Sequence, residues 1–184
     1  SVLSGTDEAV LTRQADLAIT HRIPPGFLGQ PLMPIEFVAV AHPDHPLHRL
    51  GHELSEMDLR QHRQFVVRDS GLKRRQDAGT LVGEERWTVS HLMTSIRFVK
   101  QGVGFAWLPR EHIRAELDSG LLKPLPLIAG ASRHTELYLV YTDRDSAGPA
   151  TRALAQALLD TCSSACRQAQ RARDRKNPLA DPKE

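Results

Sequence analysis

The sequence lacks several features that would place it outside the ordinary globular proteins. It contains only two cysteines, Cys162 and Cys166, which excludes the disulfide framework of small secreted domains. No apolar run approaches the length of about 20 residues that a membrane helix needs. The first residues, Ser-Val-Leu-Ser-Gly, do not form a charged and then apolar secretory leader. These absences favour a cytoplasmic protein that has no contact with a membrane.

The motifs of the common enzyme classes are also missing. There is no Gly-x-Ser-x-Gly nucleophile elbow and no Gly-x-x-x-x-Gly-Lys phosphate loop. Gly102 and Gly104 end a predicted helix, whereas a dinucleotide fingerprint opens one. The adjacent carboxylates of Glu84 and Glu85 lie in a charged stretch, which favours a solvated surface over an acid/base pair. We therefore predict no enzyme activity, no catalytic residue and no cofactor.

Histidines are concentrated between His42 and His62, which raises the possibility of a zinc site. Pro43 and Pro46 prevent a helix that would align the rings, and no cysteine is near. A solvated turn explains the pattern better, so we predict no metal site.

Charge is unevenly distributed along the chain. The net charge is +2, from 24 Lys and Arg against 22 Asp and Glu. Residues 167–184 hold six of the cations and three of the anions, which leaves 18 and 19 before them. The body is therefore nearly neutral and lacks the basic bias of a domain that binds nucleic acid by itself. Residues 167–184 are predicted to be a disordered charged tail.

The most informative stretch is residues 90–109, which predicts a helix followed by a strand. Ser90 is placed to cap the helix, and apolar residues then recur at helical spacing. Gly102 can adopt the left-handed conformation that ends the helix. Residues 104–108 are a short apolar run of strand length, so the stretch is typical of an α/β domain.

Strands and helices alternate along the rest of the chain, which favours α/β architecture with a mainly parallel sheet. Two extended runs, at residues 35–41 and 136–142, enclose a block of strand and helix units. If both runs cross between lobes, the protein has two lobes joined by two hinge strands. We predict an effector-binding domain over residues 1–166, in which lobe I comprises residues 1–45 and 142–166 and lobe II residues 48–135.

Several short motifs occur in a characteristic order between about residues 3 and 160. They are Ala15-Asp16-Leu17-Ala18-Ile19, Pro31-Leu32, Phe37-Val38-Ala39-Val40, His42-Pro43-Asp44-His45-Pro46-Leu47, Met57-Asp58-Leu59, Val99-Lys100-Gln101-Gly102-Val103-Gly104, Leu108-Pro109, Gly120-Leu121-Leu122 and Leu137-Tyr138-Leu139-Val140. Together they resemble the effector-binding domain of LysR-type transcriptional regulators. None is specific alone, and the resemblance rests on their order and spacing.

The resemblance implies a two-lobed fold of the type II periplasmic-binding-protein kind. It also implies a small metabolite bound between the lobes, promoter DNA bound through an N-terminal helix-turn-helix domain that this sequence does not include, and a homo-oligomer, either dimer or tetramer. The family's first strand and helix would lie upstream of Ser1. The alternative is a solute-binding protein that delivers a small ligand to a transporter, because that class shares the fold.

Polar residues at strand ends and helix starts are the candidate effector contacts. In open α/β sheets, ligands bind outside the carboxyl ends of strands, where helix N-termini favour anions. A carboxylate or another small anion is therefore the expected effector. On the simpler interpretation Thr6 and Ser90 only cap helices, and Arg68 pairs with Asp69. The predicted contacts are Ser4, Thr6, Thr20, Arg68, Ser70, Ser90 and His91.

Overall fold

A computed structural model describes the backbone of residues 4–68 and 82–176, and the side chains of residues 5–68 and 82–166. The described chain is α/β, and its contacts divide it into two compact units. Among the described residues, unit 1 comprises 4–8, 35–68 and 82–135, and unit 2 comprises 9–34 and 136–176. No helix in these ranges is both long and apolar enough to span a membrane.

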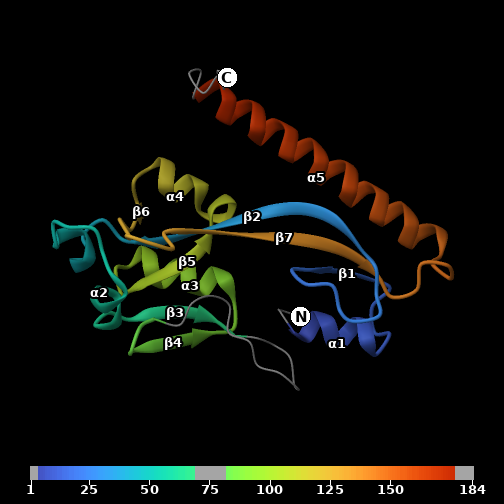
Figure 1. Cartoon of the computed structure of the whole chain (residues 1–184), viewed down its shortest axis with the longest axis horizontal. Helices are drawn as coiled ribbons and strands as arrows, with labels where there is room; N and C mark the ends of the chain where they lie inside the picture. Colours follow the sequence, from blue (N-terminus) through green and yellow to red (C-terminus); the bar gives the residue numbers. More distant parts are fainter. Residues whose placement is uncertain (1–3, 69–81, 177–184) are drawn as a thin grey trace, which may run out of the picture. The chain divides into compact units, whose positions relative to one another are not determined.

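Two long strands run through both units (Figure 1). β2 (Gly29–Ala41) passes from unit 2 into unit 1 at Ile35, and β7 (Ser132–Tyr141) returns to unit 2 at Glu136. The two crossing strands predicted from the sequence are confirmed, and each begins earlier than expected. β2 tolerates Pro31 and Pro34 in its first half, which precedes the extended run predicted at residues 35–41.

The sheet of unit 1 contains both parallel and antiparallel pairs. Its order is β2, β5 (Phe105–Pro109), β3 (Gln64–Val67) and β4 (Arg86–Val89), and β6 (Lys123–Pro124) also pairs with β2. β3 is parallel to β4 and β5, whereas β2 is antiparallel to β5 and β6. In unit 2, β1 (Leu17–Thr20) is antiparallel to β7.

The prediction of a mainly parallel sheet is therefore wrong outside the β5, β3 and β4 set. Neighbouring strands become parallel when a crossover, usually a helix, returns the chain to the same edge. β2 enters unit 1 directly from unit 2, and β1 meets β7 from the far end of the chain. Neither β2 nor β1 is joined to its neighbour by such a crossover, so both pairs are antiparallel. The hydrophobic runs in the sequence do not reveal how the strands are connected.

Alternate residues of the central strands of unit 1 enter two separate hydrophobic clusters. Val38 and Val40 of β2 belong to one cluster, and Ala39 and Ala41 belong to the other. This alternation is the two-residue period of a strand covered on both faces. The first cluster includes Ile96 and Val99 of α3 (Leu92–Lys100), and the second includes Leu59 of α2 (Glu56–Arg60).

The remaining short helices also belong to unit 1. A 3₁₀ helix, Pro46–Arg49, follows β2, and a second one, Arg110–Ile113, leads from β5 into α4 (Arg114–Asp118). Ile113 is fully buried against the α3 cluster. The chain is therefore helical from Arg110 to Asp118, and its first turn is 3₁₀.

Unit 2 is built around a smaller core. α5 (Pro149–Lys176) packs Ala155, Leu158 and Cys162 against Leu32 and Leu139 of β2 and β7. A second cluster joins Val10 of α1 (Ser4–Leu11) to Ala18 and Val140. α5 continues as helix to Lys176, into the stretch where the sequence predicts a disordered tail, and the rest of that tail, residues 177–184, lies outside the described residues.

Candidate functional site

Three of the predicted site residues lie together at one edge of unit 1. β3 and β4 are parallel, and their register aligns Val67 with Val89. Arg68 and Ser90 follow these two residues, so both lie at the carboxyl ends of neighbouring strands. His91 comes next, at the start of α3. The geometry is that expected for a ligand site in an α/β sheet, where strand ends and a helix N-terminus meet.

The start of α3 differs in one respect from the prediction. The N-cap residue is His91, with φ −132° and ψ 138°, and no side-chain hydrogen bond caps it. The prediction that Ser90 caps the helix is therefore wrong. Ser90 lies one residue too early for its hydroxyl to serve the amides that a cap satisfies. Its exposed side chain remains available to an external partner.

The first-turn amides of α3 create a local preference for negative charge. The amides of Thr94 and Ser95 both bond to the carbonyl oxygen of His91, at 3.1 and 3.3 Å. The earlier amides of a helix have no acceptor within the helix. They point outward from its N-terminus, where the helix dipole adds a partial positive charge. Arg68 is exposed at the same edge and brings a full positive charge.

Ser95, in the second turn of α3, is a further polar residue that the sequence did not single out. Only 1% of its surface is exposed, and its hydroxyl has no hydrogen-bond partner among the described residues. Nothing in the sequence separates Ser95 from a polar residue of α3 that is exposed, such as Arg97. Burial without a partner is visible only in the structure.

Thr20 ends β1 in unit 2 and is 4% exposed. Its hydroxyl donates to the carbonyl oxygen of Arg22 at 3.0 Å and accepts from the Arg22 amide at 3.3 Å. The side chain therefore forms a local turn that closes the strand. The prediction placed Thr20 at a strand end, and the structure agrees with that position.

The other predicted contacts are less informative. Thr6 lies within α1, after the start of the helix at Ser4, and is partly exposed. The side chain of Ser4 and all of Ser70 lie outside the described residues. Of the seven predicted contacts, the structure thus brings Arg68, Ser90 and His91 together.

The histidine-rich segment forms a buried contact in unit 1 instead of a fully solvated turn. His45 is 5% exposed, and its ring lies edge-on to that of His62 with centroids 5.1 Å apart. Burial and the nearby His62, His48 and His42 lower the pKa of His45 to about 4. Burial also lowers the pKa values of His48 and His62. Among the residues described, no group of three His, Cys, Asp or Glu side chains is arranged to hold a metal ion.

A pocket of about 210 Å³ lies in unit 1 next to α2 and β5. Its most distinctive members are Trp107 and Arg133, whose guanidinium carbon lies 4.7 Å from the centre of the indole ring. The sequence carries no signal for this pocket, because its walls come from five separate stretches of chain that only the folded unit brings together. The lining residues are Leu54, Ser55, Glu56, Leu59, Val82, Trp107, Leu127, Ile128, Ala129 and Arg133.

Comparison with known proteins gives one family. A sequence profile described as the LysR substrate binding domain matches residues 4–163. No curated protein matches the chain.

Solved structures with a similar fold are regulators of the LysR type. ArgP of Mycobacterium tuberculosis is 15% identical with a TM-score of 0.69, and the match covers 89% of this chain and 57% of that one. Full-length LysG of Corynebacterium glutamicum is 16% identical with a TM-score of 0.66, covering 89% and 56%. The regulatory domain of the LysR family regulator NMB2055 (MetR) of N. meningitidis is 19% identical with a TM-score of 0.62, covering 84% and 73%. The chain thus spans little more than half the length of the full-length regulators it matches.

Proposed function

We infer, since this chain belongs to the LysR substrate-binding domain family, that it is the effector-sensing part of a LysR-type transcriptional regulator. The match covers residues 4–163, most of the chain, and the fold of two units joined by crossing strands agrees with it. The same match favours the regulator over the solute-binding protein considered from the sequence. DNA binding would belong to a further domain of a longer protein.

The effector site that we propose in unit 1 is the edge formed by Arg68, Ser90 and His91. The observation that carries this proposal is the parallel register of β3 and β4, which places Arg68 and Ser90 side by side at the N-terminus of α3. A guanidinium, a hydroxyl and outward-facing helix amides all favour an anionic group. A small carboxylate is therefore the ligand class we propose. Thr20, Thr6, Ser4 and Ser70 remain proposed contacts, because the sequence places them at strand ends and helix starts.

The effector would act by shifting an equilibrium between conformations. A ligand can change that equilibrium only through its difference in affinity for the two states, at about 1.4 kcal/mol for each tenfold change. Strands β2 and β7 run through both units, so they are the natural place for a hinge. We propose that the change alters how sensor domains pack in a dimer or tetramer, and hence how the DNA-reading domains are spaced.

The remaining properties follow from the same family. We propose that the protein acts in the cytoplasm, where the promoter is, and that it binds its effector without chemical turnover. The C. glutamicum LysG has been solved with Arg as its bound effector, which supports a small-molecule effector for proteins of this fold.

The experiment that tests the proposal uses the complete gene and its product. An upstream helix-turn-helix in the gene, and a gel shift with DNA from its own promoter region, are expected. A metabolite that raises the melting temperature of this domain should change that gel shift, because a ligand selective for the folded state stabilises it by mass action. A secretory leader in place of the helix-turn-helix, together with no binding to promoter DNA, would show that the protein is not a regulator.

A further inference from the structure

The walls of the pocket beside α2 are held in place by main-chain hydrogen bonds. The Leu54 amide donates to the carbonyl oxygen of Pro126 at 2.7 Å, and the Ile128 amide donates to that of Leu54 at 3.0 Å. Leu54 is 1% exposed, so this wall is part of the core. The pocket is therefore a preformed feature of unit 1, as small-molecule sites usually are.

Trp107 presents an apolar surface to this pocket. It pairs with Ala39 in the sheet, and its indole N–H donates to the carbonyl oxygen of Gly130 at 2.8 Å. Because that only polar group is already bonded, the ring offers a ligand nothing but aromatic surface. Seven of the ten lining residues are apolar. At about 210 Å³ the pocket is smaller than the roughly 300–1,000 Å³ typical of drug-sized ligands, so its occupant must be small.

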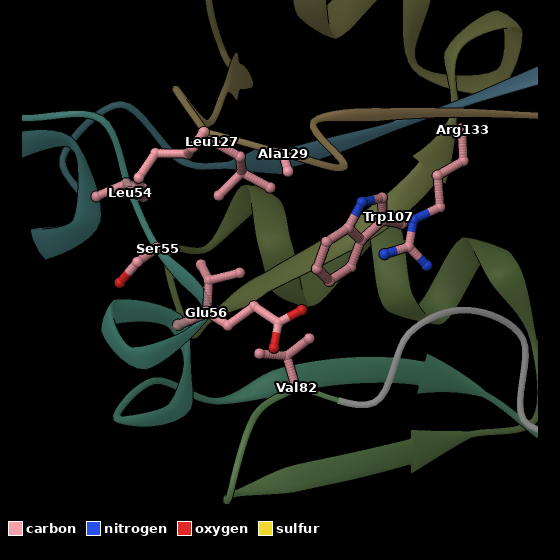
Figure 2. A pocket seen from close by; sticks show the side chains of 10 residues that line it. Leu54, Ser55, Glu56, Val82, Trp107, Leu127, Ala129 and Arg133 are labelled. Carbon is pink, nitrogen blue, oxygen red and sulfur yellow. The ribbon is translucent and has the colours of Figure 1, made fainter.

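One cation and one anion face this apolar surface. Figure 2 shows the Arg133 side chain descending over Trp107, and the Glu56 side chain extending from the start of α2 toward the same indole. The pKa of Arg133 is lowered, because burial of the guanidinium outweighs the attraction of the Glu56 carboxylate. Within the described ranges no acidic group forms an ion pair with Arg133. The guanidinium is therefore partly desolvated, and it has N–H donors that can bond to a ligand.

We propose that this pocket binds a small zwitterionic amino acid with an apolar side chain. Its carboxylate would bond to Arg133, its ammonium group would face Glu56, and its side chain would lie against Leu54, Leu127 and Trp107. Charge decides between this ligand and simpler ones. An apolar carboxylate without the amine brings a second anion near Glu56, and an apolar amine without the carboxylate brings a second cation near Arg133. Only the zwitterion complements both.

This site uses residues other than Arg68, Ser90 and His91, so it is independent of the effector site proposed above. Its occupation can be read locally from Trp107. The chain has two tryptophans, and Trp87→Phe leaves Trp107 as the only one while keeping an aromatic ring beside the stacked pair of Phe65 and Phe98. We would titrate the Trp87→Phe chain with three probes that share the 3-methylbutyl skeleton: L-leucine, which carries both charged groups, 4-methylpentanoate, which lacks the amine, and 3-methylbutylamine, which lacks the carboxylate.

L-leucine is expected to give a saturable change in Trp107 fluorescence, and each analogue should bind about tenfold more weakly or worse, since a hydrogen bond to a charged group is lost. Arg133→Gln should weaken the binding of L-leucine by a similar factor. Glu56→Gln should abolish the preference for L-leucine over 4-methylpentanoate. The matched controls are Arg144→Gln, which removes an arginine placed over Tyr141 in unit 2, and Glu53→Gln, an exposed carboxylate that does not line the pocket. Both should leave the affinity unchanged.

The proposal is overturned if L-leucine gives no saturable signal up to about 10 mM, a very weak limit on the affinity scale. It is also overturned if 4-methylpentanoate binds the unaltered pocket as tightly as L-leucine, or if Arg133→Gln and Arg144→Gln behave alike. Should Arg133→Gln fail to fold, the three probes on the Trp87→Phe chain and the exposed Glu56→Gln variant still decide the outcome.

Discussion

The backbone N–H of Arg68 donates a hydrogen bond to the carbonyl oxygen of Val89, with 2.7 Å between nitrogen and oxygen. This bond continues the parallel hydrogen-bond ladder of β3 and β4 beyond their last aligned pair, Val67 and Val89. Because the bond joins main-chain atoms, it holds the backbone of Arg68 next to that of Ser90 without help from either side chain. Substitution of either side chain should therefore leave the fold in place, so the effector site can be tested without unfolding unit 1.

Ser90→Ala combined with Thr20→Ala should weaken binding of the effector found by thermal-shift screening. Ser90 is exposed and caps nothing, so Ser90→Ala alone should change the free energy of unfolding by less than about 0.5 kcal/mol. Thr20→Ala removes a buried hydroxyl bonded to Arg22, at a cost of about 1 kcal/mol. The double variant should then melt only a few degrees lower.

Calorimetric titration measures the affinity, with Ser132→Ala as the control. Ser132 is an exposed serine at the start of β7 in unit 1, and its loss should leave the affinity unchanged. If the double variant binds as tightly as this control, neither Ser90 nor Thr20 contacts the effector.

Acidification should destabilise unit 1 through His45. The pKa of this buried ring is about 4 in the folded chain, against an ordinary value of 6.5, so between these pH values the unfolded chain binds a proton that the folded chain does not. Stability is therefore full above about pH 6.5 and falls as the pH drops toward 4. The loss reaches about 3 kcal/mol at pH 4, at 1.36 kcal/mol per pKa unit.

Urea unfolding at a series of pH values gives the slope, and His45→Asn provides the comparison. The Nδ1 atom of His45 accepts a hydrogen bond from the Leu47 amide at 3.3 Å, and an asparagine oxygen can accept that bond without titrating. The variant should lose much of the pH dependence between 6.5 and 4. His48 and His62, whose pKa values are also lowered, would supply what remains. An unchanged slope would contradict the assignment to His45.

Local patterns in the sequence predicted the elements well and their partners less well. The stripe of apolar residues and Gly102 correctly placed α3 and its end, since both signals lie within a few residues of one another. The predicted parallel direction of β2 relative to β5 was wrong. An apolar run indicates a strand, but it does not show how the chain connects that strand to its neighbour. The cap was misplaced by one residue, which is the usual uncertainty at helix ends. The pocket at Trp107 was not predicted, because Glu56 and Arg133 are far from Trp107 in the sequence and lie near it only in the folded unit.

Removal of the Ser95 hydroxyl should stabilise the chain or leave it unchanged. The oxygen is buried and has no partner among the described residues, so it loses its water on folding without compensation. Alanine also has the better helix propensity, by a few tenths of a kcal/mol. Ser95→Ala should therefore raise the free energy of unfolding by up to about 1 kcal/mol. Ser90→Ala, at an exposed position, is the control, and a loss of more than 1 kcal/mol would show that the buried hydroxyl has a bonding partner.

The two glycines after α3 should respond very differently to alanine. Gly102 has φ +75°, and an added Cβ would come no closer than 3.7 Å to His42. The cost there is conformational only, about 1 kcal/mol. At Gly104 an added Cβ would lie within van der Waals overlap of the carbonyl oxygen of Arg63, at 2.3 Å.

That carbonyl cannot move aside freely, because it accepts a hydrogen bond from the Phe105 amide at 3.0 Å and so joins β5 to the start of β3. Gly104→Ala should therefore cost about 3 kcal/mol or more, the upper range for overpacking, and Gly102→Ala much less. Urea unfolding of both variants decides the order. If Gly102→Ala were the more damaging change, the helix end would matter more to unit 1 than the approach of β5 to β3. The predicted order instead gives the second glycine of the Gly-x-Gly pair its reason: it lets two strands approach closely.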